Sequence, residues 1–94
     1  MPTIELQVTN PSGIHARPAT HFVKIASGFA SRITLENLDR ASRPVDAKSL
    51  LMLLTAGVVA GHRVRITAEG PDADAALDAL RAGIEGGLGE SASG

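Results

Sequence analysis

A histidine and an arginine stand two residues apart, just before a proline, in the segment Gly13-Ile14-His15-Ala16-Arg17-Pro18. An imidazole nitrogen is a nucleophile that can take up a phosphoryl group. A guanidinium is a planar, permanently charged donor suited to phosphate oxygens. The backbone N–H groups of Ala16 and Arg17 would add a positive cradle if these residues open a helix. This spacing suggests phosphoryl transfer through His15, with Arg17 stabilising the phosphate.

The position of Pro18 predicts where that helix begins. Proline lacks an N–H and clashes with the carbonyl four residues earlier, so a helix tolerates it only within the first turn. His15 is therefore expected at or next to the N-cap, at the positive end of the helix dipole, and Gly13 allows a tight turn into the site. The same residues are also compatible with a surface histidine beside a solvated arginine. Spacing alone leaves both interpretations open.

Periodic apolar residues predict the elements that have to hold this segment. Alternation of polar and apolar residues predicts strands, and apolar residues at helical spacing predict helices. The expected strands are residues 3–8, 32–36, 44–47 and 63–68. The expected helices are residues 16–27, residues 49–60 and a third helix that opens at 70–72 and runs to Ile84. Asp72 is expected to be a carboxylate in the first turn of this third helix.

The order of these elements predicts an α+β open-faced β-sandwich (βαββαβα), a four-stranded, largely antiparallel sheet with three helices on one face. The other face would be exposed to water, which suits the polar residues Glu5, Gln7, Arg63 and Arg65. The length of 94 residues fits one domain over residues 1–94. Residues 86–94 are rich in glycine and serine and are expected to form a flexible tail.

The composition argues against several classes of function. The net charge of -1 does not favour binding to nucleic acid or to a membrane surface. The chain has no cysteine, and His21 and His62 form no cluster with carboxylates at metal-ligand spacing, so we expect no metal and no cofactor. No apolar run is long enough to span a bilayer, and no signal peptide is recognised at the N-terminus. The expected compartment is therefore the cytoplasm.

The predicted helix over residues 49–60 carries more apolar residues than one helix face can bury. One face is expected to point toward the core and consists of Leu50, Leu53 and Gly57. A second face is left over and consists of Leu51, Leu54 and Thr55, with Met52 beside them. An exposed apolar face of this kind usually contacts a partner protein.

The segment Gly13-Ile14-His15-Ala16-Arg17-Pro18-Ala19 resembles the active-site signature of HPr. HPr is the histidine-containing phosphocarrier family of the bacterial phosphoenolpyruvate-dependent sugar phosphotransferase system. The likeness covers nearly the whole chain, and the expected elements match the open-faced sandwich of that family. The further matching segments are Phe22-Val23-Lys24, Gly28-Phe29, Ala47-Lys48-Ser49-Leu50, Gly57, Gly61 and Ile66-Thr67-Ala68-Glu69-Gly70. One departure is the loop over residues 37–43, which is longer than the usual hairpin turn and is expected to lie far from His15.

The resemblance implies that His15 accepts a phosphoryl group from phospho-enzyme I through Nδ1 and donates it to IIA domains of sugar permeases. Arg17 would steady the phosphoryl group. Such a protein is not a free-standing enzyme, because it turns over only between a donor and an acceptor protein. The implied partner-binding surface consists of Ala16, Thr20, Leu51, Met52, Leu54 and Thr55. We expect the chain to be a monomer.

Ser49 has two interpretations. It precedes a helical run, and serine is a favourable N-cap residue. In the HPr family this serine position can also carry a regulatory phosphate that blocks partners by its charge. Met52 stands where the regulated proteins usually have glycine, so capping is favoured over regulation.

Two other functions are compatible with these residues. The chain could be an HPr-like carrier of a regulatory, nitrogen-type relay or of a dihydroxyacetone-kinase relay, since the site would be the same. It could also be an interaction module that binds partners through Leu51 and its neighbours without phosphoryl transfer. Such a module has no need of His15 and Arg17, so the phosphocarrier interpretation is favoured.

Overall fold

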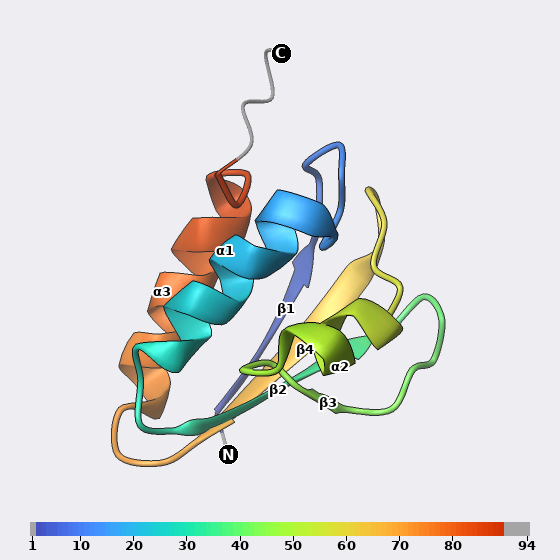
Figure 1. Cartoon of the computed structure of the whole chain (residues 1–94). Helices are drawn as coiled ribbons and strands as arrows, with labels where there is room; N and C mark the ends of the chain where they lie inside the picture. Colours follow the sequence, from blue (N-terminus) through green and yellow to red (C-terminus); the bar gives the residue numbers. More distant parts are fainter. Residues whose placement is uncertain (1, 90–94) are drawn as a thin grey trace.

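A four-stranded antiparallel sheet forms the centre of the computed structural model, which describes residues 2–89 (Figure 1). Its strands are β1 (Thr3–Gln7), β2 (Arg32–Asn37), β3 (Val45–Asp46) and β4 (Arg63–Glu69). They lie in the order β1-β4-β2-β3, so that β4 pairs with β1 on one side and with β2 on the other. Each strand matches its predicted range to within a residue or so at either end, and the predicted α+β open-faced sandwich is confirmed.

Three helices cover one face of this sheet: α1 (Ala16–Ser27), α2 (Leu50–Thr55) and α3 (Ala73–Glu85). Helices α1 and α3 lie side by side, and α2 packs against α1 and β3. Buried residues at helical spacing, such as Ala19, Phe22 and Ala26 of α1, join the core above the sheet. Complete burial of Phe22 contributes about 1.5–3 kcal/mol and anchors the middle of α1 to the core.

The opposite face of the sheet is polar, as predicted from the alternation along its strands. Arg65 in β4 bridges two acidic residues on the neighbouring strands, with nitrogen–oxygen distances of 3.0 Å to Glu5 and 3.1 Å to Glu36. Arg63 lies 3.6 Å from the same Glu5 carboxylate. The side chains that alternate with these face the helices, which places the apolar core on one side of the sheet only.

Helix α2 is shorter than predicted. It ends at Thr55 instead of continuing to residue 60, because Gly57 adopts a left-handed φ of +63° and Ala56 and Gly57 donate to the carbonyls of Leu53 and Leu54. The predicted core-facing role of Leu50 is wrong as well. Only Leu53 is buried, and Leu50 is 40% exposed, because so short a helix turns one position toward the sheet.

The end of α3 differs from the expected flexible tail. The N–H of Leu88 donates to the carbonyl of Gly83 at 2.8 Å, and that of Gly87 donates to Ile84 at 3.0 Å, the pattern of a Schellman cap with Gly87 at a φ of +87°. This cap returns Leu88 to the core, where it is fully buried. Residues 86–89 therefore form a packed helix end, and the rest of the predicted tail, residues 90–94, lies outside the described residues.

Asp72 joins the start of α3 to the turn between α1 and β2 instead of capping its own helix with its side chain. Its carboxylate accepts hydrogen bonds from the backbone N–H groups of Ala30 at 2.8 Å and Ser31 at 2.9 Å, and from the Ser31 hydroxyl. Its side chain makes no cap hydrogen bond to α3. The hydroxyl and the two N–H groups stabilise the carboxylate and hold the pKa of Asp72 below its ordinary value of 3.8.

We expect this contact to make the stability of the fold sensitive to acid. A lowered pKa stabilises the native state above the ordinary value of 3.8, and this contribution is lost as the pH falls through the lowered pKa. Thermal unfolding followed by circular dichroism across the acid range should show a steeper fall of Tm for the wild type than for Asp72→Asn. Asp74→Asn, on the exposed first turn of the same helix, is the control. Identical acid profiles for wild type and Asp72→Asn would contradict the expectation.

Candidate functional site

His15 is the N-cap residue of α1, as predicted from the position of Pro18. Its backbone is extended, with φ -132° and ψ 163°, and its carbonyl accepts the N–H of Ala19 at 3.4 Å. Pro18 is buried in the first turn, where its missing N–H leaves no bond unmade. The imidazole is half-buried and makes no cap hydrogen bond to α1.

Ala16 and Arg17 form the exposed beginning of the helix. Ala16 has a φ of +51°, a left-handed conformation that costs a residue with a Cβ about 1–2 kcal/mol. Strained backbone of this kind occurs at active sites, where surrounding structure holds it in place. Arg17 is exposed at the positive end of the helix. The two residues are thus exposed directly after His15 in the chain, where first-turn N–H groups and a guanidinium would suit an anion.

The segment before His15 rests on the loop between α2 and β4. The N–H of Ile14 donates to the carbonyl of Val58 at 3.0 Å, and Ile14 is fully buried. Gly13 has a φ of +58°, and a Cβ built on it would overlap the backbone of Val58 and Val59. Only glycine therefore allows the chain to lie this close to the loop. This contact helps to position the backbone that leads into His15.

Gly13→Ala is expected to destabilise the fold by about 2–4 kcal/mol, the sum of left-handed strain and a backbone overlap that cannot be relieved by a side-chain rotation. Urea unfolding monitored by circular dichroism measures the change. Gly61→Ala is a matched control, because Gly61 has a φ of +92° but no atom within 4 Å of its Cβ position. The control should lose only about 1 kcal/mol. Equal losses in the two variants would show that the overlap at Gly13 is unimportant.

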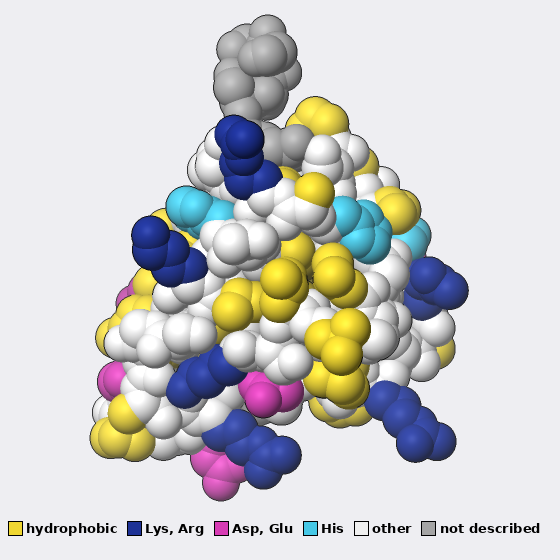
Figure 2. Space-filling view, viewed as in Figure 1, with side chains coloured by type: hydrophobic (Ala, Val, Ile, Leu, Met, Phe, Trp, Pro, Cys, Tyr) yellow, Lys and Arg dark blue, Asp and Glu magenta, His cyan; other side chains and the backbone are white. Residues whose placement is uncertain are grey.

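An exposed apolar surface, which we call the α2 surface, lies beside this helix start. It consists of Leu51, Met52 and Leu54, which are 74%, 43% and 37% exposed. Figure 2 shows hydrophobic side chains gathered over α2, with histidine side chains close by and Lys and Arg side chains around the rim. Helix α1, which follows His15, packs against the helix that carries this surface.

The other predicted site residues lie on the same two helices. Thr20 and Thr55 are exposed, and each turns its hydroxyl back to its own helix, to the carbonyls of Ala16 and Met52. Ser49 is the N-cap of α2, and its hydroxyl oxygen accepts the N–H of Met52 at 3.3 Å. The capping role predicted for Ser49 is therefore present in the structure.

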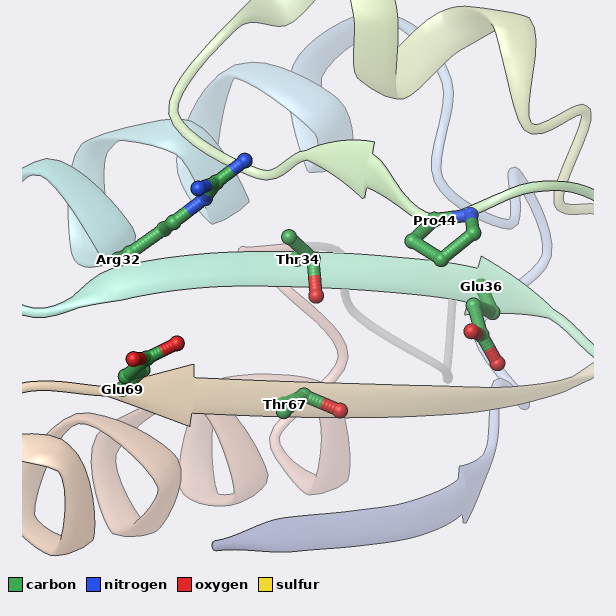
Figure 3. Close-up of a pocket in the computed structure, with 6 residues that line it drawn as sticks. All are labelled: Arg32, Thr34, Glu36, Pro44, Thr67 and Glu69. Carbon is green, nitrogen blue, oxygen red and sulfur yellow. The ribbon is translucent and has the colours of Figure 1, made fainter. Parts of the chain in front are cut away.

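Two hollows of the described surface lie away from His15. One of about 270 Å³ lies on the open face of the sheet and is lined by Arg32, Thr34, Glu36, Pro44, Thr67 and Glu69 (Figure 3). His15 borders neither this hollow nor the adjacent one near Lys48. Within residues 2–89 no three His, Cys, Asp or Glu side chains come together as a metal site, and no helix there is long and apolar enough to cross a membrane.

Sequence reasoning missed the side chains that support the loop beneath Gly13. Asn37 is fully buried at the end of β2 and contacts His62, which stands just before β4. Asn37, the last residue of β2, therefore links the start of the loop over residues 37–43 to the segment on which Gly13 and Ile14 rest. A buried asparagine at a strand end is the one local signal that could have drawn attention to it.

The chain is similar to known proteins over most of its length. A family model described as the PTS HPr component phosphorylation site matches residues 2–85. The multiphosphoryl transfer protein of Salmonella typhimurium (strain LT2) is 46% identical over 88 residues, which cover 94% of this chain and 23% of that protein. The chain thus spans less than a quarter of the length of this curated relative.

Two solved structures share the fold over nearly their whole length. HPr from Thermoanaerobacter tengcongensis superimposes with a TM-score of 0.90 at 38% identity, covering 97% of this chain and 99% of that one. The phosphocarrier protein HPr of Bacillus anthracis str. Ames gives a TM-score of 0.82 at 35% identity, covering 88% and 95%. These matches fit a phosphocarrier of the phosphotransferase system, and they do not favour a nitrogen-type or dihydroxyacetone-kinase relay. The chain belongs to the HPr family of phosphocarrier proteins of the phosphotransferase system.

Proposed function

We propose that His15 accepts a phosphoryl group from phospho-enzyme I and passes it to IIA domains of sugar permeases. The observation that carries this proposal is the placement of a half-buried imidazole without a cap hydrogen bond at the N-cap of α1, next to Arg17 and beside the α2 surface. The site therefore combines a nucleophile, a positive surrounding and an apolar surface for a partner.

The transfer requires only a nucleophile and groups that stabilise the charge of the phosphoryl group. The lone pair of the His15 Nδ1 attacks phosphorus and forms an N–P bond, while the bond between phosphorus and the donor breaks and its electron pair stays with the donor. The negative charge on the transferred group is stabilised by the first-turn N–H groups of Ala16 and Arg17 and by the Arg17 guanidinium. In the second transfer the IIA domain supplies the nucleophile, and His15 recovers its lone pair.

Partners bind the α2 surface in this proposal, with Ala16 and Thr20 at its junction with the helix start. Leu51 is the most exposed large apolar side chain of the described residues, and its burial in a complex would remove apolar area from water. A partner seated there brings its own reactive group over His15. The chain works as a monomer in the cytoplasm, and Ser49 serves as a cap, with regulation through Ser49 as a further role to be tested.

The direct test is to incubate the chain with phosphoenolpyruvate and enzyme I. We expect one acid-labile phosphate per chain, located on His15 by mass spectrometry of the intact peptide, and loss of that phosphate when an IIA domain is added. A label found on His21 or His62 instead would refute the assignment. A stable, acid-resistant label would point to Ser49 and a different reaction.

A further inference from the structure

Asn37 and His62 form a polar cluster that holds together the loop over residues 56–62. The Asn37 side-chain nitrogen donates to the carbonyl of Ala56 at 3.0 Å and lies 3.1 Å from the His62 Nδ1. The backbone N–H of Val59 also points to this Nδ1, at 3.3 Å. One asparagine and one imidazole thus connect the beginning, the middle and the end of the loop.

The contacts determine the hydrogen-bonding state of both side chains. The Asn37 side-chain oxygen accepts the N–H of Asp39 at 3.1 Å, and its nitrogen faces the Ala56 carbonyl, so the amide can have only one orientation. The His62 Nδ1 then meets two N–H donors, from Asn37 and from Val59. It can satisfy them only through its lone pair, which leaves the ring proton on Nε2.

This cluster bears on His15 through the backbone. The loop that it fixes contains Val58, whose carbonyl accepts the N–H of Ile14, and Gly13 lies directly against Val58 and Val59. The loop is also tied to the end of β1, since the backbone N–H of Val8 donates to the carbonyl of His62 at 2.9 Å. Displacement of the loop would therefore move the segment that places His15 at the helix start.

We propose that Asn37 and His62 are positioning residues for phosphoryl transfer, acting through the loop 56–62 to hold the backbone of residues 13–15. This inference rests on the proposed function of His15. The essential feature is a hydrogen-bond acceptor at the position of the His62 Nδ1. Neither side chain touches the phosphate, so their effect is on how well His15 is placed when the donor docks.

The geometry offers a matched pair of substitutions. In His62→Asn the side-chain oxygen stands as many bonds from Cβ as Nδ1 does, so it can accept from Asn37 and Val59. In His62→Gln the oxygen stands one bond further out, near the place of Nε2, and cannot. His21→Gln, on the exposed side of α1, is the control for loss of a histidine as such.

Three measurements on the full chain test the proposal. Nitrogen NMR of the wild type should show His62 protonated on Nε2 and unprotonated on Nδ1. Hydrogen exchange of the Ile14 amide should be at least about 10-fold faster in His62→Gln than in the wild type, since its bond to Val58 is loosened. Phosphorylation of His15 by enzyme I should lose about 10- to 100-fold in kcat/KM in His62→Gln, as expected for a misplaced reacting group.

His62→Asn should restore both the exchange and the transfer rate to within a few-fold of the wild type, and His21→Gln should leave them unchanged. A wild-type proton on Nδ1 would overturn the proposal, as would equal behaviour of the Asn and Gln variants. If instead the wild type is not phosphorylated at His15, the proposed function fails, and the tautomer and exchange measurements still decide whether the cluster holds the loop.

Discussion

His15→Ala is expected to abolish phosphorylation by phosphoenolpyruvate and enzyme I. No other described histidine combines a helix N-cap, a neighbouring arginine and an adjacent apolar surface. The substitution should leave the fold intact, because the imidazole is only half-buried and makes no cap hydrogen bond, so that the loss of stability stays at about 1 kcal/mol or below. Radiolabelled phosphoenolpyruvate, with circular dichroism to confirm folding, measures both properties.

Arg17→Ala removes the guanidinium next to the acceptor and so tests its role separately from that of the His15 imidazole. The imidazole is still present, so the chain should be labelled, but the rate should fall about 100-fold, the usual consequence of removing one donor that stabilises developing charge. His21→Ala is the matched control and should be labelled at the rate of the wild type. Continued labelling of His15→Ala would sink the assignment of the acceptor, whereas an unchanged rate for Arg17→Ala would remove only the role of the guanidinium.

Leu51→Glu is expected to weaken transfer from enzyme I mainly through KM. Leu51 is 74% exposed, so its replacement changes the stability of the free chain by about 0.5 kcal/mol at most. In a complex the same side chain would be buried, and loss of its burial would cost about 1.5–3 kcal/mol, which corresponds to roughly 10- to 100-fold in affinity. Steady-state transfer assays over a range of carrier concentrations separate KM from kcat.

A control for the added charge is available on α3. Ala75→Glu introduces the same carboxylate at an exposed position on another helix. It should leave KM within about 2-fold of the wild type, as expected for a charge outside the contact surface. A similar rise of KM in both variants would indicate a general charge effect. An unchanged KM in Leu51→Glu would show that partners do not use the α2 surface.

Much of the site can be predicted from local sequence patterns, namely the position of a proline and the spacing of apolar residues. Pro18 is confined to a first helical turn, and this placed His15 at or next to the N-cap; in the structure it is the N-cap residue. The apolar residues of Leu50-Leu51-Met52-Leu53-Leu54 outnumber what one helix face can bury. Leu51, Met52 and Leu54, which were expected on the second face or beside it, are exposed in the structure. Period-two and helical spacing likewise determine the order of strands and helices.

Helix ends were harder to predict, because they depend on a single backbone conformation. The turn at Gly57 ends α2 early, although the apolar pattern of the sequence runs on to Val58 and Val59. At the end of α3, a glycine-rich segment forms a Schellman cap because Leu88 finds a place in the core. Composition alone cannot distinguish a glycine in a flexible segment from a glycine that adopts the left-handed conformation of a helix cap.

The sequence by itself determined that a histidine would stand at a positive helix start and that another helix would expose an apolar face, since each of these properties depends on residues a few positions apart. Only the tertiary structure decided what supports that histidine. Asn37 and His62 are 25 residues apart, and Ser31 and Asp72 are 41 apart, so their hydrogen bonds exist only once the sheet has formed. Gly13 could be recognised as a turn residue, but the backbone of Val58 pressed against it comes from the far side of the chain. Contacts of this range follow from the packing of whole elements, and no local pattern encodes them.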